Sequence, residues 1–280
     1  MSYRIRTFRR DGLTFDVLDE GPVAGPVVVL LHGFPERSSA WRDVAPLLHG
    51  RGLRTLAMDQ RGYSPGARPK RRRDYRFGLL VDDVAALITQ VGGPVHVVGH
   101  DLGAAVGWFL AARHPELVRT LTAVSVPHPR AFVSALLTSG QVTKSWYMAA
   151  FQLPRIPELT AARPGGRFDQ SLLSGGMTED EVARFRTEIV DYGALTGALN
   201  WYRAMPLVGP LMQRSAVRVP TTYIWSDGEI AVDRRSAVLA ERWVDAPYEF
   251  VVLPGVSHWI PTQAPEACAA AILERIGSVG

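Results

Sequence analysis

The sequence predicts an α/β protein: a mainly parallel β-sheet with helices on both faces and a helical segment inserted late in the sheet. Short apolar runs alternate with stretches of helical periodicity in the first half of the chain, which is the pattern of βαβ units. The strand pattern stops near residue 130 and resumes near residue 216. With 280 residues, 47% of them hydrophobic, the chain is long enough for one large core.

The N-terminal elements are a predicted hairpin and a buried strand. Residues 3–19 alternate polar and apolar side chains around Asp11-Gly12, a pair that favours a tight hairpin turn. Residues 27–31 are continuously apolar, which indicates a strand buried on both faces of a parallel sheet. This strand ends at His32-Gly33.

Helices and strands then alternate as far as residue 126. Helices are predicted from apolar residues at a spacing of three and four, and strands from short apolar runs. The predicted elements are a helix over 40–48, a strand over 55–58, a helix over 79–91, a strand over 95–98, a helix over 104–113 and a strand over 121–126.

The segment from about 130 to 216 has helical and loop-like patterns, with many aromatic residues and several Pro and Gly breaks. Strands are predicted again over 221–225 and 249–253, before a last helix over 265–276. We therefore expect an α/β core in two parts, residues 1–129 and 216–280, with a helical cap over 130–215. A cap above the carboxyl ends of the strands would enclose a cavity for a small molecule.

Composition argues against several classes of partner. The net charge is +4, and the densest basic run, residues 70–73, lies in a Pro- and Gly-rich loop without the interleaved aromatic residues of a nucleic-acid binder. No stretch approaches the roughly 18 apolar residues that cross a bilayer, and residues 1–10 have no signal-peptide pattern. We expect a cytoplasmic protein without nucleic-acid or membrane partners. Cys268, the only cysteine, is expected to be buried in the last helix.

The most informative motif is residues 99–103, Gly-His-Asp-Leu-Gly, between a predicted strand and a predicted helix. A strand, a sharp turn and a helix, with small residues two before and two after the central side chain, form a nucleophile elbow. The central residue here is Asp101. The alternative is that Asp101 is only the N-cap of the following helix, a position that Asp favours.

A carboxylate at this position indicates a different reaction from that of the usual serine. It displaces at a saturated carbon and forms an alkyl ester that water must cleave, which points to epoxides or alkyl halides. A competing G-x-S-x-G match occurs at residues 62–66. Pro65 lacks the amide that an oxyanion hole takes from the residue after the nucleophile, and no helix pattern follows, so we expect Ser64 to be a loop residue.

A carboxylate nucleophile needs a base that activates water, an acid that orients the base, and donors for the oxyanion. His258 is the predicted base, because it follows the strand at 249–253 and precedes the last helix. The loop after residues 223–225 offers Asp227 and Glu229 as the acid, whereas Asp233 resembles a helix N-cap. The predicted oxyanion donors are the amides of Phe34 and Leu102.

These residues together resemble the α/β-hydrolase-fold epoxide hydrolases over nearly the whole chain. Residues 32–36 with 41–42 look like the oxyanion loop of that family, and residues 59–63 like its second signature. Residues 99–101 look like its elbow, and residues 126–129 are similar to its entry to the cap. The resemblance implies the α/β-hydrolase fold, with a mainly parallel eight-stranded sheet and a helical cap inserted after strand 6.

Two tyrosines in the predicted cap extend the resemblance. The family uses two cap tyrosines that hydrogen-bond the epoxide oxygen and donate a proton as the ring opens. Here Trp146-Tyr147 precedes residues 151–154 at the family's spacing, and residues 200–203, Asn-Trp-Tyr-Arg, match the second motif. The resemblance therefore implies that Tyr147 and Tyr202 are these proton donors. An epoxide needs them because its oxygen stays attached as an alkoxide.

Two positions depart from the family. Alignment of residues 225–229 puts Glu229 where an aspartate usually stands, so Glu229 is the predicted acid and Asp227 remains an alternative. Leu102 stands where tryptophan often follows the nucleophile, which keeps the backbone amide and is expected to change the shape of the pocket. We expect Phe34, Pro35 and Trp259 to line the substrate pocket.

The predicted function is hydrolysis of an epoxide to a vicinal diol, with water as co-substrate and without a metal or other cofactor. A haloalkane or haloacid dehalogenase with the same Asp-His pair is the first alternative. The resemblance argues against it, because Leu102 supplies neither the indole nor the arginine of those enzymes. The second alternative is a non-catalytic small-molecule-binding protein of the same fold.

Overall fold

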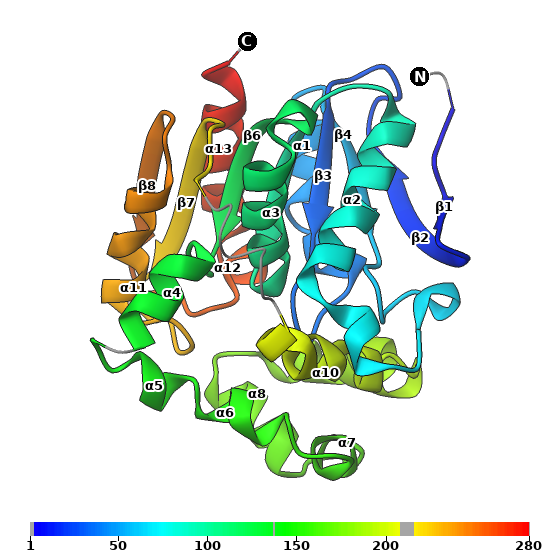
Figure 1. Ribbon diagram of the computed structural model, residues 1–280, viewed down its shortest axis with the longest axis vertical. Coiled ribbons are helices and arrows are strands. Elements are labelled where there is room, and N and C mark those ends of the chain that lie inside the picture. Colours follow the sequence, from blue (N-terminus) through cyan, green and yellow to red (C-terminus); the bar gives the residue numbers. More distant parts are fainter. Residues whose placement is uncertain (1–2, 137, 208–215, 280) are drawn as a thin grey trace.

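The structure is a computed structural model that describes residues 3–136, 138–207 and 216–279, and it contains one eight-stranded sheet (Figure 1). The strand order is β1-β2-β4-β3-β5-β6-β7-β8. The β1/β2 and β2/β4 pairs are antiparallel, and all other neighbouring pairs are parallel. The predicted mainly parallel, eight-stranded sheet is confirmed. The strands are β1 (Thr7–Arg10), β2 (Leu13–Glu20), β3 (Val27–Leu31), β4 (Arg54–Met58), β5 (Val95–His100), β6 (Val118–Val124), β7 (Thr221–Ser226) and β8 (Tyr248–Leu253).

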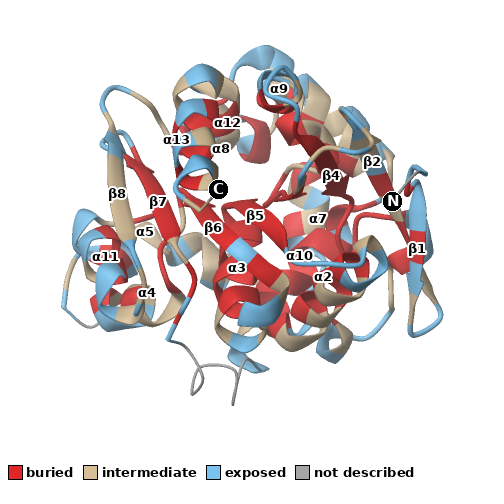
Figure 2. Ribbon diagram, turned by 90° about the horizontal axis from the view of Figure 1, so that it is seen from above, coloured by how far each residue is buried: buried red, intermediate tan, exposed pale blue. Residues whose placement is uncertain are grey.

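Helices cover both faces of the sheet. Figure 2 shows α2 (Phe77–Val91) and α3 (Leu102–Arg113) on one face, with α12 (Ile260–Gln263) and α13 (Pro265–Gly277) on the other. Strand β3 supplies both layers, because Val29 belongs to the apolar cluster on the α2/α3 side and Val28 to the cluster that includes α13. Burial on both faces is the reason that the central strands are continuous apolar runs.

The chain between β6 and β7 is helical in its described part. Its helices lie at one end of the sheet, below the strands in Figure 1. They are α4 (Pro129–Leu136), α5 (Gln141–Lys144), α6 (Trp146–Ala150), α7 (Ile156–Ala161), α8 (Arg167–Ser174), α9 (Glu179–Phe185), the π-helix η5 (Arg186–Asp191), α10 (Leu195–Ala204) and η6 (Met205–Leu207). We refer to this segment as the cap. The predicted end of the cap at residue 215 lies outside the described residues, and the division at 129 and 215 stays a prediction.

The remaining helices are short. They are η1 (Ser38–Trp41), α1 (Ala45–His49), η2 (Pro65–Ala67), η3 (Arg72–Tyr75), η4 (Pro115–Leu117), α11 (Arg234–Val238) and η8 (Leu239–Trp243). No helix within residues 3–136, 138–207 and 216–279 is long and apolar enough to span a membrane. Residues 70–73 are exposed, as expected of a solvated loop, and Cys268 is buried in α13.

Most predicted boundaries lie within three residues of those in the structure, and two of the differences have a clear physical reason. The helix predicted over 40–48 is two helices, η1 and α1. Pro46 has no N–H to donate within a continuous helix, so it is tolerated only in the first turn, and a new helix begins at Ala45. The helix predicted to start near residue 104 begins at Leu102, directly after the turn at Asp101. The second difference matters for the site, since no spacer separates the turn from the helix.

Candidate active site

Asp101 occupies a strained turn between β5 and α3. Its backbone has φ 52° and ψ −124°, a combination that non-glycine residues rarely adopt. The flanking glycines make the turn possible. A Cβ on Gly99 would lie 2.4 Å from the carbonyl oxygen of Gly103, and a Cβ on Gly103 would lie 2.3 Å from that of Leu31. The turn therefore requires the small residues from which the elbow was predicted.

The alternative that Asp101 is only a helix cap is not supported by its contacts. Within the described chain, the Asp101 side chain makes no capping hydrogen bond to α3. Its Oδ1 instead accepts a hydrogen bond of 2.9 Å from the backbone amide of Phe34, which follows β3. Ser64, the competing nucleophile, is fully buried and donates to the carbonyl oxygen of Asp59 at 2.7 Å, so it is a structural loop residue.

The site lies where the strand order reverses. β3 pairs with β4 on one side and with β5 on the other, and parallel α/β sheets bind ligands in the crevice at such a point. The loop that follows β3 brings Phe34 close to Asp101, the residue directly after β5. Gly33 permits this approach, because a Cβ there would lie 2.4 Å from the Cβ of Asp101.

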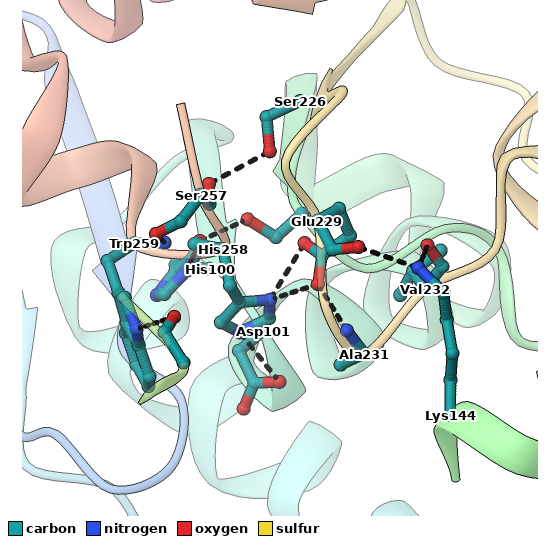
Figure 3. Close-up of polar contacts among 12 residues, drawn as sticks. His100, Asp101, Lys144, Ser226, Glu229, Ala231, Val232, Ser257, His258 and Trp259 are labelled. Carbon is teal, nitrogen blue, oxygen red and sulfur yellow. Dashed lines mark hydrogen bonds and ion pairs between the residues drawn. The ribbon is translucent and has the colours of Figure 1, made fainter. Parts of the chain in front are cut away.

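His258 lies between the two carboxylates, as Figure 3 shows. Its Nε2 is 3.4 Å from Asp101 Oδ2, and its Nδ1 is 2.8 Å from each carboxylate oxygen of Glu229. All three side chains are buried. The hydroxyl of Ser125 donates to the backbone carbonyl of His258 at 2.8 Å, which fixes the loop that carries the imidazole. The structure thus brings together the predicted nucleophile, base and acid.

The three acidic residues of this loop differ in how far they are buried and in what their carboxylates contact. Glu229 is 4% exposed, and its Oε1 also accepts from the amide of Ala231 at 2.7 Å. Asp227 is exposed and accepts from the amide of Gly255 at 2.7 Å. Asp233 caps α11 by accepting from the amide of Arg235, as predicted. Glu229 is therefore the acid whose carboxylate faces His258.

The charges of the buried groups stabilise one another. Burial alone would lower the pKa of His258, but the negative charge of Glu229 and hydrogen bonds to both carboxylates raise the pKa to about 10. Burial opposes the charge of Asp101, yet the hydrogen bond and charge of His258 hold the pKa of Asp101 below its usual value. The unliganded site therefore favours a charged carboxylate beside a protonated imidazole.

Tyr147 on α6 and Tyr202 on α10 lie in the same cavity as Asp101, with their ring centroids 6.0 Å apart. Burial raises the pKa of both tyrosines, and the charge of Asp101 raises it further, so each keeps its proton. The neighbours of Tyr202 anchor α10. The Trp201 indole donates to the carbonyl of Arg61 at 2.6 Å, and Arg203 pairs with Glu158.

The second signature motif supports the loop that carries Phe34. The side chain of Gln60 donates to the backbone carbonyl of His32 at 2.6 Å, and the amide of Gln60 donates to His32 Nε2 at 3.1 Å. Asp59 pairs with Arg37 and accepts from the amide of Ser38. These contacts explain why the motifs at 32–36 and 59–63 occur together.

The cavity between cap and core has a volume of about 540 Å³. Phe34, Pro35 and Trp259, the residues predicted for the substrate pocket, line this cavity together with Asp101, His258 and both tyrosines. Phe168 on α8, which the sequence did not predict as a pocket residue, stacks on Phe151 in the cavity wall. A lone phenylalanine in an amphipathic helix has no signal that separates a pocket wall from a core.

Leu102, the second departure from the family, is the first residue of α3. Its side chain is 6% exposed and belongs to the apolar cluster that also contains Phe34 and Tyr202, and it is not among the described residues that line the cavity. The expected effect of this leucine on the shape of the pocket stays a prediction. Its backbone amide begins α3 next to Asp101.

Comparisons with known proteins agree with this geometry. A family model described as alpha/beta hydrolase fold matches residues 26–265. The AB hydrolase superfamily protein YfhM of Bacillus subtilis is 36% identical, with 95% of each chain covered. Epoxide hydrolase 3 of Xenopus tropicalis is 32% identical, with 91% of this chain and 72% of that protein covered. The crystal structure of an epoxide hydrolase from Vigna radiata matches with a TM-score of 0.82 and 29% identity, covering 98% of this chain and 97% of the other.

Proposed function

Because this chain belongs to the alpha/beta hydrolase fold family and has epoxide hydrolases among its relatives, we propose that it hydrolyses an epoxide to a vicinal diol. One observation carries the proposal. Two tyrosines that keep their protons share a cavity with a buried aspartate whose neighbours favour its charged form. A leaving halide would need no proton, whereas the alkoxide of an opening epoxide does.

In the first step, Asp101 attacks an epoxide carbon and the ring C–O bond breaks. Oδ1 is engaged by the Phe34 amide and Oδ2 faces His258, so we assign the attack to Oδ2. A proton from Tyr147 or Tyr202 moves to the epoxide oxygen as the bond opens. The product is an ester between Asp101 and one carbon of the substrate, with a free hydroxyl on the other.

In the second step, water attacks the carbonyl carbon of this ester, and His258 accepts the proton at Nε2. Glu229 holds the proton on Nδ1 and so fixes the tautomer that leaves Nε2 free. Oδ1 becomes the oxyanion, which the amides of Phe34 and Leu102 stabilise. Collapse breaks the bond between the Asp101 carbonyl carbon and the substrate oxygen, and the proton on His258 passes to that oxygen, which completes the diol. The proton of the newly formed carboxylic acid returns through solvent to the tyrosinate, so the Asp101 carboxylate, His258 and the tyrosine are all regenerated.

The ester itself prepares the base for this step. His258 has a pKa of about 10 because two carboxylates face it. Esterification removes the negative charge of Asp101, so the pKa of His258 falls once the intermediate has formed. Esterification therefore shifts the equilibrium toward the neutral imidazole that the second step requires.

We further propose that the enzyme works in the cytoplasm, which fractionation of the source cells would test.

The test is diol formation from a panel of aliphatic and aromatic epoxides. Wild-type protein should form diols, and Asp101→Asn should lose at least about a thousandfold in turnover, in line with removal of a nucleophile. Unchanged turnover in Asp101→Asn would refute the role of Asp101 as the nucleophile. Halide release from haloalkanes without epoxide turnover would favour the dehalogenase instead, and binding without turnover would favour the non-catalytic alternative.

A further inference from the structure

The loop at residues 227–233, which we call the acid loop, connects β7 to α11 and carries Glu229. Its first half is held by the core. Gly228 donates from its amide to the carbonyl of Val256 at 3.1 Å, and a Cβ on Gly228 would lie 2.6 Å from that same oxygen. The amide of Glu229 donates to Ser226 at 3.3 Å. The second half is held by the cap.

Two side chains of α5 hydrogen-bond the backbone of this second half. Lys144 Nζ donates to the carbonyl of Glu229 at 2.7 Å and to that of Val232 at 3.5 Å, and Figure 3 shows its side chain reaching the loop from α5. One helical turn earlier, Gln141 Nε2 donates to the carbonyl of Ala231 at 2.7 Å. Gln141 Oε1 accepts from the amide of Asp233 at 2.8 Å.

These hydrogen bonds fix both the side chains of α5 and the backbone of the acid loop. Gln141 is fully buried, and both ends of its amide are used, so the side chain has one orientation that satisfies it. Lys144 adds a charged donor to the very residue whose carboxylate faces His258. Hydrogen bonds from a charged donor are stronger than those between neutral groups.

We propose that Gln141 and Lys144 are positioning residues for the reaction proposed above: they hold the acid loop so that the longer side chain of glutamate meets the imidazole of His258. The inference rests on the proposed function, because it assigns the pair to one of its two steps. Glutamate has one more rotatable bond than aspartate, so a fixed backbone is needed to present both oxygens at 2.8 Å from Nδ1.

The two-step reaction gives this role a kinetic signature. Glu229 acts through His258, and His258 is needed to hydrolyse the ester. Formation of the ester depends on Asp101 and the tyrosines. Loss of the α5 contacts should therefore slow ester hydrolysis and leave ester formation nearly unchanged. A displacement of about 1 Å in a catalytic group can cost about a hundredfold in rate, so we expect ester hydrolysis to fall about tenfold to a hundredfold.

The decisive variant is Lys144→Met, with Lys70→Met as a matched control, since these are the two lysines of the chain and Lys70 is exposed in a loop of the core. Lys144→Arg keeps a charged donor and should recover most of the rate. Gln141→Met tests the second contact. Under single-turnover conditions with an epoxide, intact-protein mass spectrometry follows the ester and chromatography follows the diol. The Lys144→Met protein should accumulate the ester, whereas wild type and Lys70→Met should not.

Three results would overturn the proposal. Ester hydrolysis at the wild-type rate in both Lys144→Met and Gln141→Met would show that the contacts are dispensable. Equal slowing of both steps, with a lowered melting temperature, would show a general role in cap stability. Equal slowing without a change in stability would place Lys144, which also lines the cavity, in substrate binding. Failure of the proposed function is distinct, because wild-type protein would then form neither ester nor diol, and both proposals would fall.

Discussion

Shortening the proposed orienting acid by one methylene, Glu229→Asp, should disable the second step of the proposed reaction. In the structure both oxygens of Glu229 lie 2.8 Å from His258 Nδ1. One C–C bond is about 1.5 Å long, so an aspartate on the same backbone would end about 4 Å from Nδ1, beyond hydrogen-bonding range. The loop cannot readily follow, because the core holds residue 228 and α5 holds residues 229 to 233.

The expected loss in the rate of ester hydrolysis lies between two reference values. Misplacing a catalytic group by about 1 Å costs about a hundredfold, and loss of the correct tautomer in a serine-protease triad costs about ten-thousandfold. We expect ester hydrolysis in Glu229→Asp to fall by about a hundredfold to a thousandfold, with ester formation within a few-fold of wild type. Rapid mixing with an epoxide, acid quenching and mass measurement separate the two steps. The Asp227→Ala protein is the control, because Asp227 is exposed and its rates should not change. Ester hydrolysis at the wild-type rate in Glu229→Asp, or its loss in Asp227→Ala, would refute the assignment of the acid.

Three further predictions follow from the same geometry. The rate of ester hydrolysis should rise with pH and then reach a plateau, because the neutral form of His258 is required. The midpoint of the rise should lie below about 10, the pKa of His258 in the unesterified site, since esterification lowers that pKa. A rate that falls with pH over this range would contradict the role of His258 as base. Tyr202→Phe should slow ester formation by about a hundredfold, the scale of a lost general acid, and leave hydrolysis of the preformed ester unchanged, which the same quenched reactions measure. Gly103→Ala should destabilise the fold by about 1–3 kcal/mol, since its Cβ would meet a β3 carbonyl at 2.3 Å, whereas Gly93→Ala, with open space around it, should keep the wild-type midpoint in urea.

The sequence was most informative where physics leaves few choices. The central strands are buried on both faces, so Val28 and Val29 must both be apolar and the run is visible without a structure. The elbow was visible for a steric reason, because Gly99 and Gly103 stand where any Cβ would collide with backbone. His258 was found from chain order alone. These features constrain residue type at fixed positions, and such constraints appear directly in a sequence.

The choice of acid shows where sequence reasoning stops. Asp227, Glu229 and Asp233 lie within seven positions of one loop and have similar chemistry. What separates them is burial and direction, and these depend on Val256, Gln141 and other groups far away in the chain. The contacts of α5 were not predicted, because side chains that bind a distant backbone leave no periodic pattern.

The substitution of glutamate for the family's aspartate changes what the cap must do. Glutamate has one more rotatable bond than aspartate, so the position of its carboxylate depends more on the contacts of the loop that carries it. In this chain that loop is bound by Lys144, three residues before Tyr147. The segment 141–147 thus joins the proposed proton donor of the first step to the support of the acid in the second. A change in cap position would act on both steps through this one segment, although a single side chain, Lys144 or Tyr147, should affect only one of them. Separate effects from Lys144→Met and Tyr147→Phe, one on ester hydrolysis and the other on ester formation, are therefore the sharpest consequence of this arrangement.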